Sequence, residues 1–110
     1  MKQLAYSLLF FLAVGIITME SCTVDEPVTE VTYTADVKPI MDGNCIGCHS
    51  GNTPSASLDL TTYANVRAIA ETDTLVMRMN DEVNPMPVTG LLPQADRTTV
   101  EDWVAGGFKQ

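Results

Sequence analysis

Cys45-Ile46-Gly47-Cys48-His49 is the most informative stretch of this chain. Two cysteines that are separated by two residues and followed directly by a histidine form the pattern of covalent c-type haem attachment. In that chemistry both thiols become thioethers to the haem vinyl groups, and the imidazole of the next residue binds the iron. We therefore expect Cys45 and Cys48 to anchor one haem c, and His49 to ligate its iron.

The first 21 residues have the pattern of an export signal. Lys2 precedes an apolar run from Leu8 to Ile17, and Ser21 lies directly before Cys22. The order of basic, apolar and small residues is typical of a signal peptide, and the run is shorter than the roughly 20 residues of a membrane span. Because the site resembles a bacterial lipobox, we expect residues 1–21 to be a lipoprotein-type signal peptide and Cys22 to be lipidated. An uncleaved anchor, or a conventional signal peptide cut elsewhere, is the alternative.

This assignment uses all three cysteines of the chain, two for haem and one for lipid. A disulfide between Cys45 and Cys48 is the alternative, but it would leave the adjacent His49 unexplained. Every version of the export signal places the folded part outside the cytoplasm. We expect it in the periplasm or cell envelope, held at a membrane by the lipid on Cys22.

A tether and one small domain follow the signal peptide. Residues 22–32 are rich in Thr, Val, Glu and Asp, contain Pro27 and lack a helical period, which predicts a flexible tether. Residues 33–110 then form a single domain. Domains of this size often need a cross-link or a cofactor to complete their core. A covalent haem would supply a large, flat apolar surface.

The chain is acidic, with 6 Lys and Arg against 14 Asp and Glu and a net charge of −8. Residues 1–21 contain one lysine and one glutamate, so the exported part keeps this net charge. Lys and Arg do not cluster anywhere, and nucleic acid is therefore not an expected partner. The acidic surface can steer a basic redox partner, or it can simply be solvated.

The first and last of four predicted helices carry apolar residues that are expected to pack together. Residues 34–41 place Val37, Ile40 and Met41 on one face, and Gly43 is expected to end this helix. Since a proline is tolerated only near a helix start, Pro39 indicates that the helix is short or begins late. Residues 94–105 stop at a glycine pair. The residues expected on the inner side of this last helix are Ala95, Val100, Trp103 and Val104. We expect Trp103 to pack in the core against the first helix; the alternative is an electron conduit beside the haem.

Two further helices are predicted between these two. Thr61-Thr62 can cap a helix that runs to about Ala70, and the next helix runs from Asp73 to Asn80. The residues expected to face inward are Tyr63, Val66 and Ile69 in the former helix, and Leu75, Val76 and Met79 in the latter.

A methionine lies between two prolines in the loop before the last helix. The stretch Pro85-Met86-Pro87 excludes a helix and fixes an extended loop that can hold a thioether in place. Electron-transfer cytochromes commonly pair a histidine with a methionine on the iron, and His49 is the only histidine of the chain. We expect Met86 to be the second iron ligand. The alternatives are Met77 and Met79, which lie in a helical pattern typical of core residues, and an open or water-bound position.

Several stretches appear in the order found in one family. They are Asp36–Met41, Cys45–His49, Leu58-Asp59-Leu60, Met86-Pro87 with Gly90, and Leu92 through Trp103 to the terminal glycine pair. In this order the chain resembles a small bacterial class I cytochrome c over roughly Tyr33 to Phe108. The resemblance is particularly close to the cytochrome c domains that accompany exported bacterial oxidoreductases. One departure is Pro93, where family members often have a Ser or Asp cap.

The resemblance implies an all-α fold of about four short helices around one covalent haem, with the N- and C-terminal helices packed together. It also implies His49 as the proximal ligand and Met86 as the distal ligand. The expected function is single-electron transfer without chemistry on a substrate, so the protein is not expected to be an enzyme. Expected partners are redox proteins, such as an exported oxidoreductase or a respiratory complex.

Two other functions are compatible with parts of the pattern. The first is a haem enzyme, or a sensor of gas or peroxide, with an open sixth iron site; the chain offers no distal histidine for such a role. The second is a dithiol oxidoreductase or a zinc site built on Cys45, Cys48 and His49. The oxidoreductase would need strands alternating with helices around the motif, and zinc would need a fourth ligand.

Overall fold

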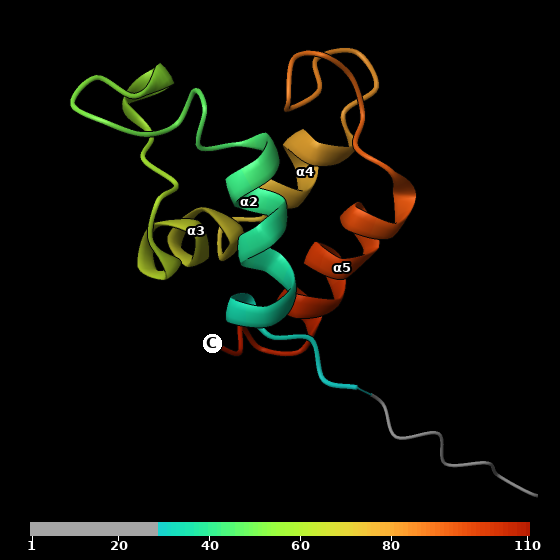
Figure 1. Cartoon of the computed structure of the whole chain (residues 1–110). Helices are drawn as coiled ribbons and strands as arrows, with labels where there is room; N and C mark the ends of the chain where they lie inside the picture. Colours follow the sequence, from blue (N-terminus) through green and yellow to red (C-terminus); the bar gives the residue numbers. More distant parts are fainter. Residues whose placement is uncertain (1–28) are drawn as a thin grey trace, which may run out of the picture.

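The computed structural model describes residues 29–110, and within them the fold is all-α without strands (Figure 1). Four α-helices form one domain, as the sequence predicts. The expected signal peptide, Cys22 and most of the expected tether lie outside the described residues. Of that tether, Glu30 forms an ion pair with Lys109 and Val31 packs against the core. None of the helices in residues 29–110 is long and apolar enough to cross a membrane.

The N-terminal helix begins with a π-helical turn, η1 (Tyr33–Val37), that leads directly into α2 (Lys38–Asn44). Thr32 caps its start, because its hydroxyl accepts the Ala35 N–H at 3.3 Å while its own N–H donates to the Asp36 carboxylate at 2.8 Å. This reciprocal arrangement satisfies backbone donors that no helical carbonyl can reach. The start of the helix therefore agrees with the sequence prediction within one residue.

The expected end of this helix at Gly43 is wrong, because α2 continues through Gly43 to Asn44. A glycine inside a helix costs only about 1 kcal/mol relative to alanine, which does not stop a helix whose next residue, Cys45, still bonds to the Met41 carbonyl at 2.9 Å. Pro39 lies in the first turn of α2, directly after the wider π-helical turn. The α-helix proper thus begins just before Pro39, at a position where a proline is tolerated.

The middle of the chain forms a 3-10 turn, η2 (Ser55–Ser57), and the helices α3 (Tyr63–Ala70) and α4 (Thr74–Asn80). As predicted, Thr62 caps α3, with its hydroxyl accepting a backbone N–H at 3.3 Å. Helix α4 begins one residue later than predicted because Asp73 has a φ of 59°, in the left-handed region. Both middle helices are otherwise where the apolar pattern placed them.

The C-terminal helix α5 (Gln94–Ala105) has the predicted bounds. Its end is a Schellman motif, in which Gly107, at φ 84°, and Phe108 donate their N–H groups to the carbonyls of Val104 and Trp103 at 3.1 and 3.0 Å. At the start, Pro93 provides no side-chain cap. The glycine pair therefore ends the helix as the sequence predicts.

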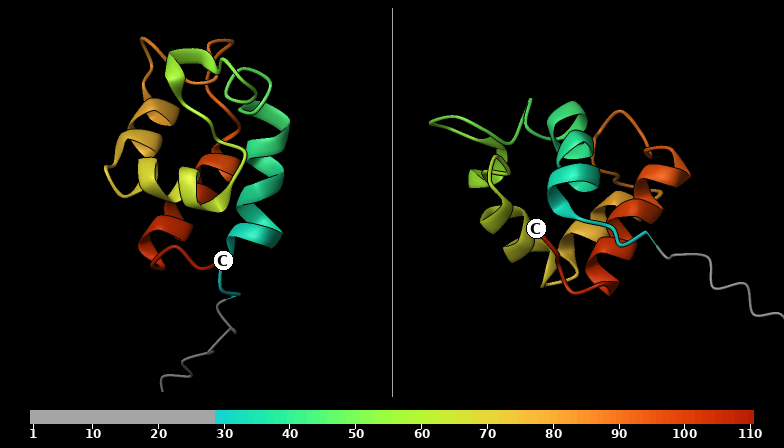
Figure 2. Two further views of the ribbon diagram at one scale, coloured as in Figure 1. Left: turned by 90° about the vertical axis from the view of Figure 1, so that its left-hand side faces the viewer. Right: turned by 60° about the horizontal axis from the view of Figure 1, so that its bottom comes forward.

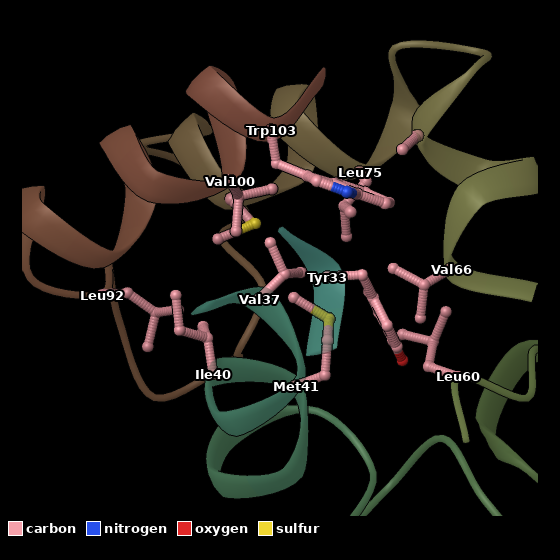
Figure 3. Close-up of a cluster of buried hydrophobic side chains, with 12 residues drawn as sticks. Tyr33, Val37, Ile40, Met41, Leu60, Val66, Leu75, Leu92, Val100 and Trp103 are labelled. Carbon is pink, nitrogen blue, oxygen red and sulfur yellow. The ribbon is translucent and has the colours of Figure 1, made fainter. Parts of the chain in front are cut away.

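The four helices enclose one apolar core (Figure 3). Its buried members are Tyr33, Val37, Ile40, Met41, Leu60, Val66, Ala70, Leu75, Met79, Leu92, Val100 and Trp103. The N- and C-terminal helices are in contact, as predicted, and Trp103 is fully buried with its ring centroid 5.7 Å from that of Tyr33. Ala95, expected on the inner side of α5, is exposed. It lies in the first turn of the helix, ahead of the part that packs on the core.

The C-x-x-C-H motif and the C-terminus lie at opposite ends of the domain. The segment that follows α2, with the C-x-x-C-H motif, and the loop 81–93 that joins α4 to α5 lie at the same end of the molecule (Figures 1 and 2). The C-terminus and the beginning of η1 lie at the opposite end, where the Tyr33 N–H donates to the Lys109 carbonyl at 2.7 Å. The C-x-x-C-H motif and the loop that contains Met86 thus lie at one end of the domain.

Candidate functional site

The two cysteines of the motif lie on one tight turn that continues α2. The N–H groups of Cys48 and His49 donate to the Cys45 carbonyl at 3.2 and 3.0 Å. In such a turn, residues three positions apart lie on the same side of the chain. Both cysteines are free thiols; Cys45 is half-buried and Cys48 is exposed. The local backbone therefore presents two unpaired thiols one turn apart, as attachment to one flat group requires.

The imidazole of His49 is held by the backbone of the following loop. Its Nδ1 lies 3.2 Å from the carbonyl oxygen of Ser55 and 3.2 Å from that of Leu58. Because both partners can only accept, Nδ1 is the donor in these contacts, and in a neutral ring the lone pair is then on Nε2. That is the tautomer of a histidine that ligates a metal through Nε2, with the other nitrogen fixed by a carbonyl.

The loop that holds this imidazole is itself anchored on the motif. The Cys48 carbonyl accepts the Ser55 N–H at 2.9 Å, and the His49 carbonyl accepts the Leu60 N–H at 2.8 Å. Leu60 is buried in the core, so these two bonds fix the loop relative to the helices. The sequence does not mark Ser55 and Leu58 as partners of His49, because any residue type can supply a carbonyl. The turn-rich stretch from Gly51 to Ser55 indicates only that a loop follows His49.

Met86 lies half-buried in the loop 81–93, which has no helix, as predicted. Its N–H donates to the Arg78 carbonyl of α4 at 2.9 Å. The beginning of the loop is ordered by Asp81, whose carboxylate accepts the N–H groups of Asn84 and Val83, both at 2.9 Å. These two bonds, first that of Asn84, hold the pKa of Asp81 below its ordinary value.

The competing methionines have different environments. Met79 is 2 % exposed and belongs to the core, the role that the sequence analysis favoured for it. Met77 is 60 % exposed, so the core role expected for it is wrong. Together with Val76 and Val104, Met77 lines a surface hollow of about 410 Å³ between α4 and α5, to which no residue of the C-x-x-C-H motif contributes. Of the three methionines, only Met86 lies in the loop at the same end as the motif.

The thiols do not have the properties of a dithiol oxidoreductase. Burial raises the pKa of the Cys45 thiol, whereas the first cysteine of a catalytic C-x-x-C pair needs a lowered pKa and access to solvent. The strands that such an enzyme places around the motif do not occur in residues 29–110. The burial of Cys45 and the helical surroundings of the motif therefore do not favour a dithiol oxidoreductase.

A zinc site has no support in the arrangement of the side chains. Within the described part of the chain, no three His, Cys, Asp or Glu side chains lie close enough together to share one metal ion. Cys45, Cys48 and His49 therefore do not converge on a single point, as a tetrahedral zinc site requires. Haem attachment needs no such convergence, since two thioethers at the macrocycle edge and one imidazole at the iron are spread over a large flat group.

The donor set at this end of the domain matches haem c in chemistry: two free thiols one turn apart, an imidazole with a free Nε2, and a thioether in a restrained loop. Comparisons with protein-family models, curated proteins and solved structures give no match to this chain. The functional assignment therefore rests on the chemistry of these residues.

Proposed function

We propose that this protein is a mono-haem c-type cytochrome that carries single electrons between redox partners in the cell envelope. The observation that carries this proposal is the His49 imidazole, whose Nδ1 donates to two backbone carbonyls directly after two free cysteines. A histidine so restrained has only Nε2 available for a metal. When bound, haem c supplies one-electron chemistry through its ferrous and ferric states.

The residues of the chain have distinct roles in this proposal. Cys45 and Cys48 would hold the haem covalently, and His49 and Met86 would ligate its iron. A methionine ligand raises the reduction potential relative to a second imidazole. The contact between the N- and C-terminal helices is compatible with the class I cytochrome c fold that the sequence resembles.

The charges favour a basic redox partner. The cationic side chains that pair with carboxylates are Lys38 with Asp42, Arg67 with Glu71, Arg78 with Asp81, and Lys109 with Glu30. The net charge of the chain is −8, so the long-range field of the protein is negative and steers positively charged surfaces toward it. We further propose that lipid on Cys22 holds the exported protein at a membrane.

The haem assignment is tested by expressing the full chain together with a haem-attachment system. We expect a pyridine haemochrome spectrum of haem c and an intact mass that includes one haem. Cys45→Ala and Cys48→Ala should each lose one thioether, and the double variant should lose all covalent haem. Cys22→Ala is the matched control, because it removes a thiol outside the motif and should keep the haem. A full chain without covalent haem under these conditions contradicts the proposal.

A further inference from the structure

Arg97 joins the two ends of the loop that carries Met86. Its Nε donates to the Leu92 carbonyl at 3.1 Å, near the end of the loop 81–93, and its Nη1 donates to Oδ1 of Asn80 at 2.5 Å, directly before the loop begins. Its Nη2 donates to Oε1 of Gln94 at 2.6 Å. All three nitrogens of one planar guanidinium are thus in use, and the group spans the base of the loop.

Asn80 is oriented for this contact by two other bonds. Its Nδ2 donates to the Val76 carbonyl at 3.0 Å and to Oε1 of Glu101 at 2.8 Å. With its amide nitrogen bound to two acceptors, the amide oxygen faces Arg97. The bond to Glu101 also ties the end of α4 to α5, so Arg97 binds a preorganised acceptor.

The second half of the loop depends on this contact more than the first half does. Before Met86, the loop is held by the Asp81 carboxylate and by the bond from Met86 to the Arg78 carbonyl. After Met86, the side chains of Val88 and Thr89 are exposed, and the Gly90 N–H donates to the Pro87 carbonyl at 3.1 Å, which closes a turn within the loop. The chain is next held by the helices at Leu92, whose side chain is buried and whose carbonyl is bound by Arg97. Restraining both ends of a loop reduces the conformations available to its middle.

We propose that Arg97 is a positioning residue for Met86. By closing the base of the loop, Arg97 keeps the Met86 thioether at the iron. This inference rests on the proposed haem function. A lysine cannot substitute, because a single ammonium group lacks the planar set of donors that reaches three separate acceptors.

The test compares Arg97→Gln and Arg97→Lys with the wild-type full chain, each loaded with haem. We expect both variants to keep covalent haem but to weaken the methionine-to-iron charge-transfer band of the ferric protein, and to lower the midpoint potential. Carbon monoxide should bind the ferrous variants about tenfold faster, which is the shift expected when the net loss equals about one hydrogen bond to a charged group.

Two control variants separate positioning from general stability. Arg67→Gln removes an exposed arginine of α3 that pairs with Glu71. It should leave the methionine-to-iron band, the midpoint potential and the rate of carbon monoxide binding unchanged. Trp103→Phe should lower the melting temperature without changing the band. Asn80→Ala removes the acceptor of Arg97, so it should weaken the band as the Arg97 variants do, and it provides the test if those variants fold poorly.

The inference and the proposed function fail in different ways. In a Met86→Ala background, Arg97→Gln should produce no further change in potential, because the ligand that it positions is gone. If the wild-type band requires Met86 but stays unchanged in Arg97→Gln and Asn80→Ala, the positioning role is wrong and the haem assignment stands. If the wild-type chain binds no haem, or if Met86→Ala leaves its spectrum unchanged, the proposed ligand set itself is wrong.

Discussion

The two proposed iron ligands are held in contrasting ways. His49 lies on a turn that continues α2, and its imidazole is fixed by carbonyls of Ser55 and Leu58, within ten residues along the chain. Met86 lies in a long loop whose ends are joined through side chains of two different helices, α4 and α5. Local hydrogen bonds thus fix His49, whereas the loop of Met86 depends on local bonds to Arg78 and Asp81 and, in addition, on tertiary contacts between α4 and α5. The position of the Met86 side chain is therefore more easily altered than that of the His49 side chain.

Replacing each proposed ligand should give the largest effects and tests this contrast directly. His49→Ala should strongly lower the yield of haem-loaded protein, because the iron would lose its imidazole ligand. Met86→Ala should keep covalent haem, lower the potential and open the iron to carbon monoxide. Haemochrome yield and carbon monoxide titration measure the two effects. Met77→Ala, at an exposed position, is the control; equal losses in the Met77 and Met86 variants would contradict the assignment of Met86.

The aromatic part of the core gives the next largest effect. Trp103 is fully buried, its ring contacts those of Tyr33, Tyr63 and Phe108, and its Nε1 donates to the Lys109 carbonyl at 2.7 Å. Trp103→Ala should lower the free energy of unfolding by about 3–5 kcal/mol, measured by chemical denaturation. Trp103→Phe keeps most of the apolar contact and should lose about 1 kcal/mol through the missing hydrogen bond. A loss below 1 kcal/mol in the alanine variant would show that the aromatic cluster is not central to the core.

Acid should affect the methionine loop through Asp81, and this is the smallest expected effect. The folded pKa of Asp81 is held below its ordinary value of 3.8, mainly by the Asn84 and Val83 N–H groups. The carboxylate therefore stabilises the loop above about pH 4, and this contribution is lost as the pH falls through the lowered pKa. The methionine-to-iron band followed from pH 6 to pH 2 should weaken at the acidic end.

Asp81→Asn is the matched variant for this titration, because it keeps an acceptor oxygen but cannot ionise. It should weaken the band slightly at neutral pH and remove part of the acid dependence. Asp102→Asn, on the exposed side of α5, should leave the band at neutral pH and its acid dependence unchanged. Identical acid profiles in the wild type and in Asp81→Asn would show that Asp81 does not order the loop.

Much of the fold follows from signals that act within a few residues. The glycine pair after α5 ends that helix where the sequence predicts, because a glycine at positive φ completes the terminal hydrogen bonds. Thr62 caps α3 for an equally local reason. Other local signals fail: Ala95 fits the apolar period of α5 but is exposed, and Gly43, the expected end of the first helix, lies inside α2.

The sequence by itself determined the all-α class, the helix bounds to within a few residues, and the residues of the proposed haem site, because spacing, caps and chemical identity are properties of short stretches. Only the tertiary structure decided which nitrogen of His49 is free, which methionine lies at the end of the domain that carries the motif, and how Arg97 closes the loop of Met86. These depend on backbone carbonyls and on side chains from separate helices. A carbonyl has no signature in the sequence, and residues far apart in the chain meet only when the core brings their helices together.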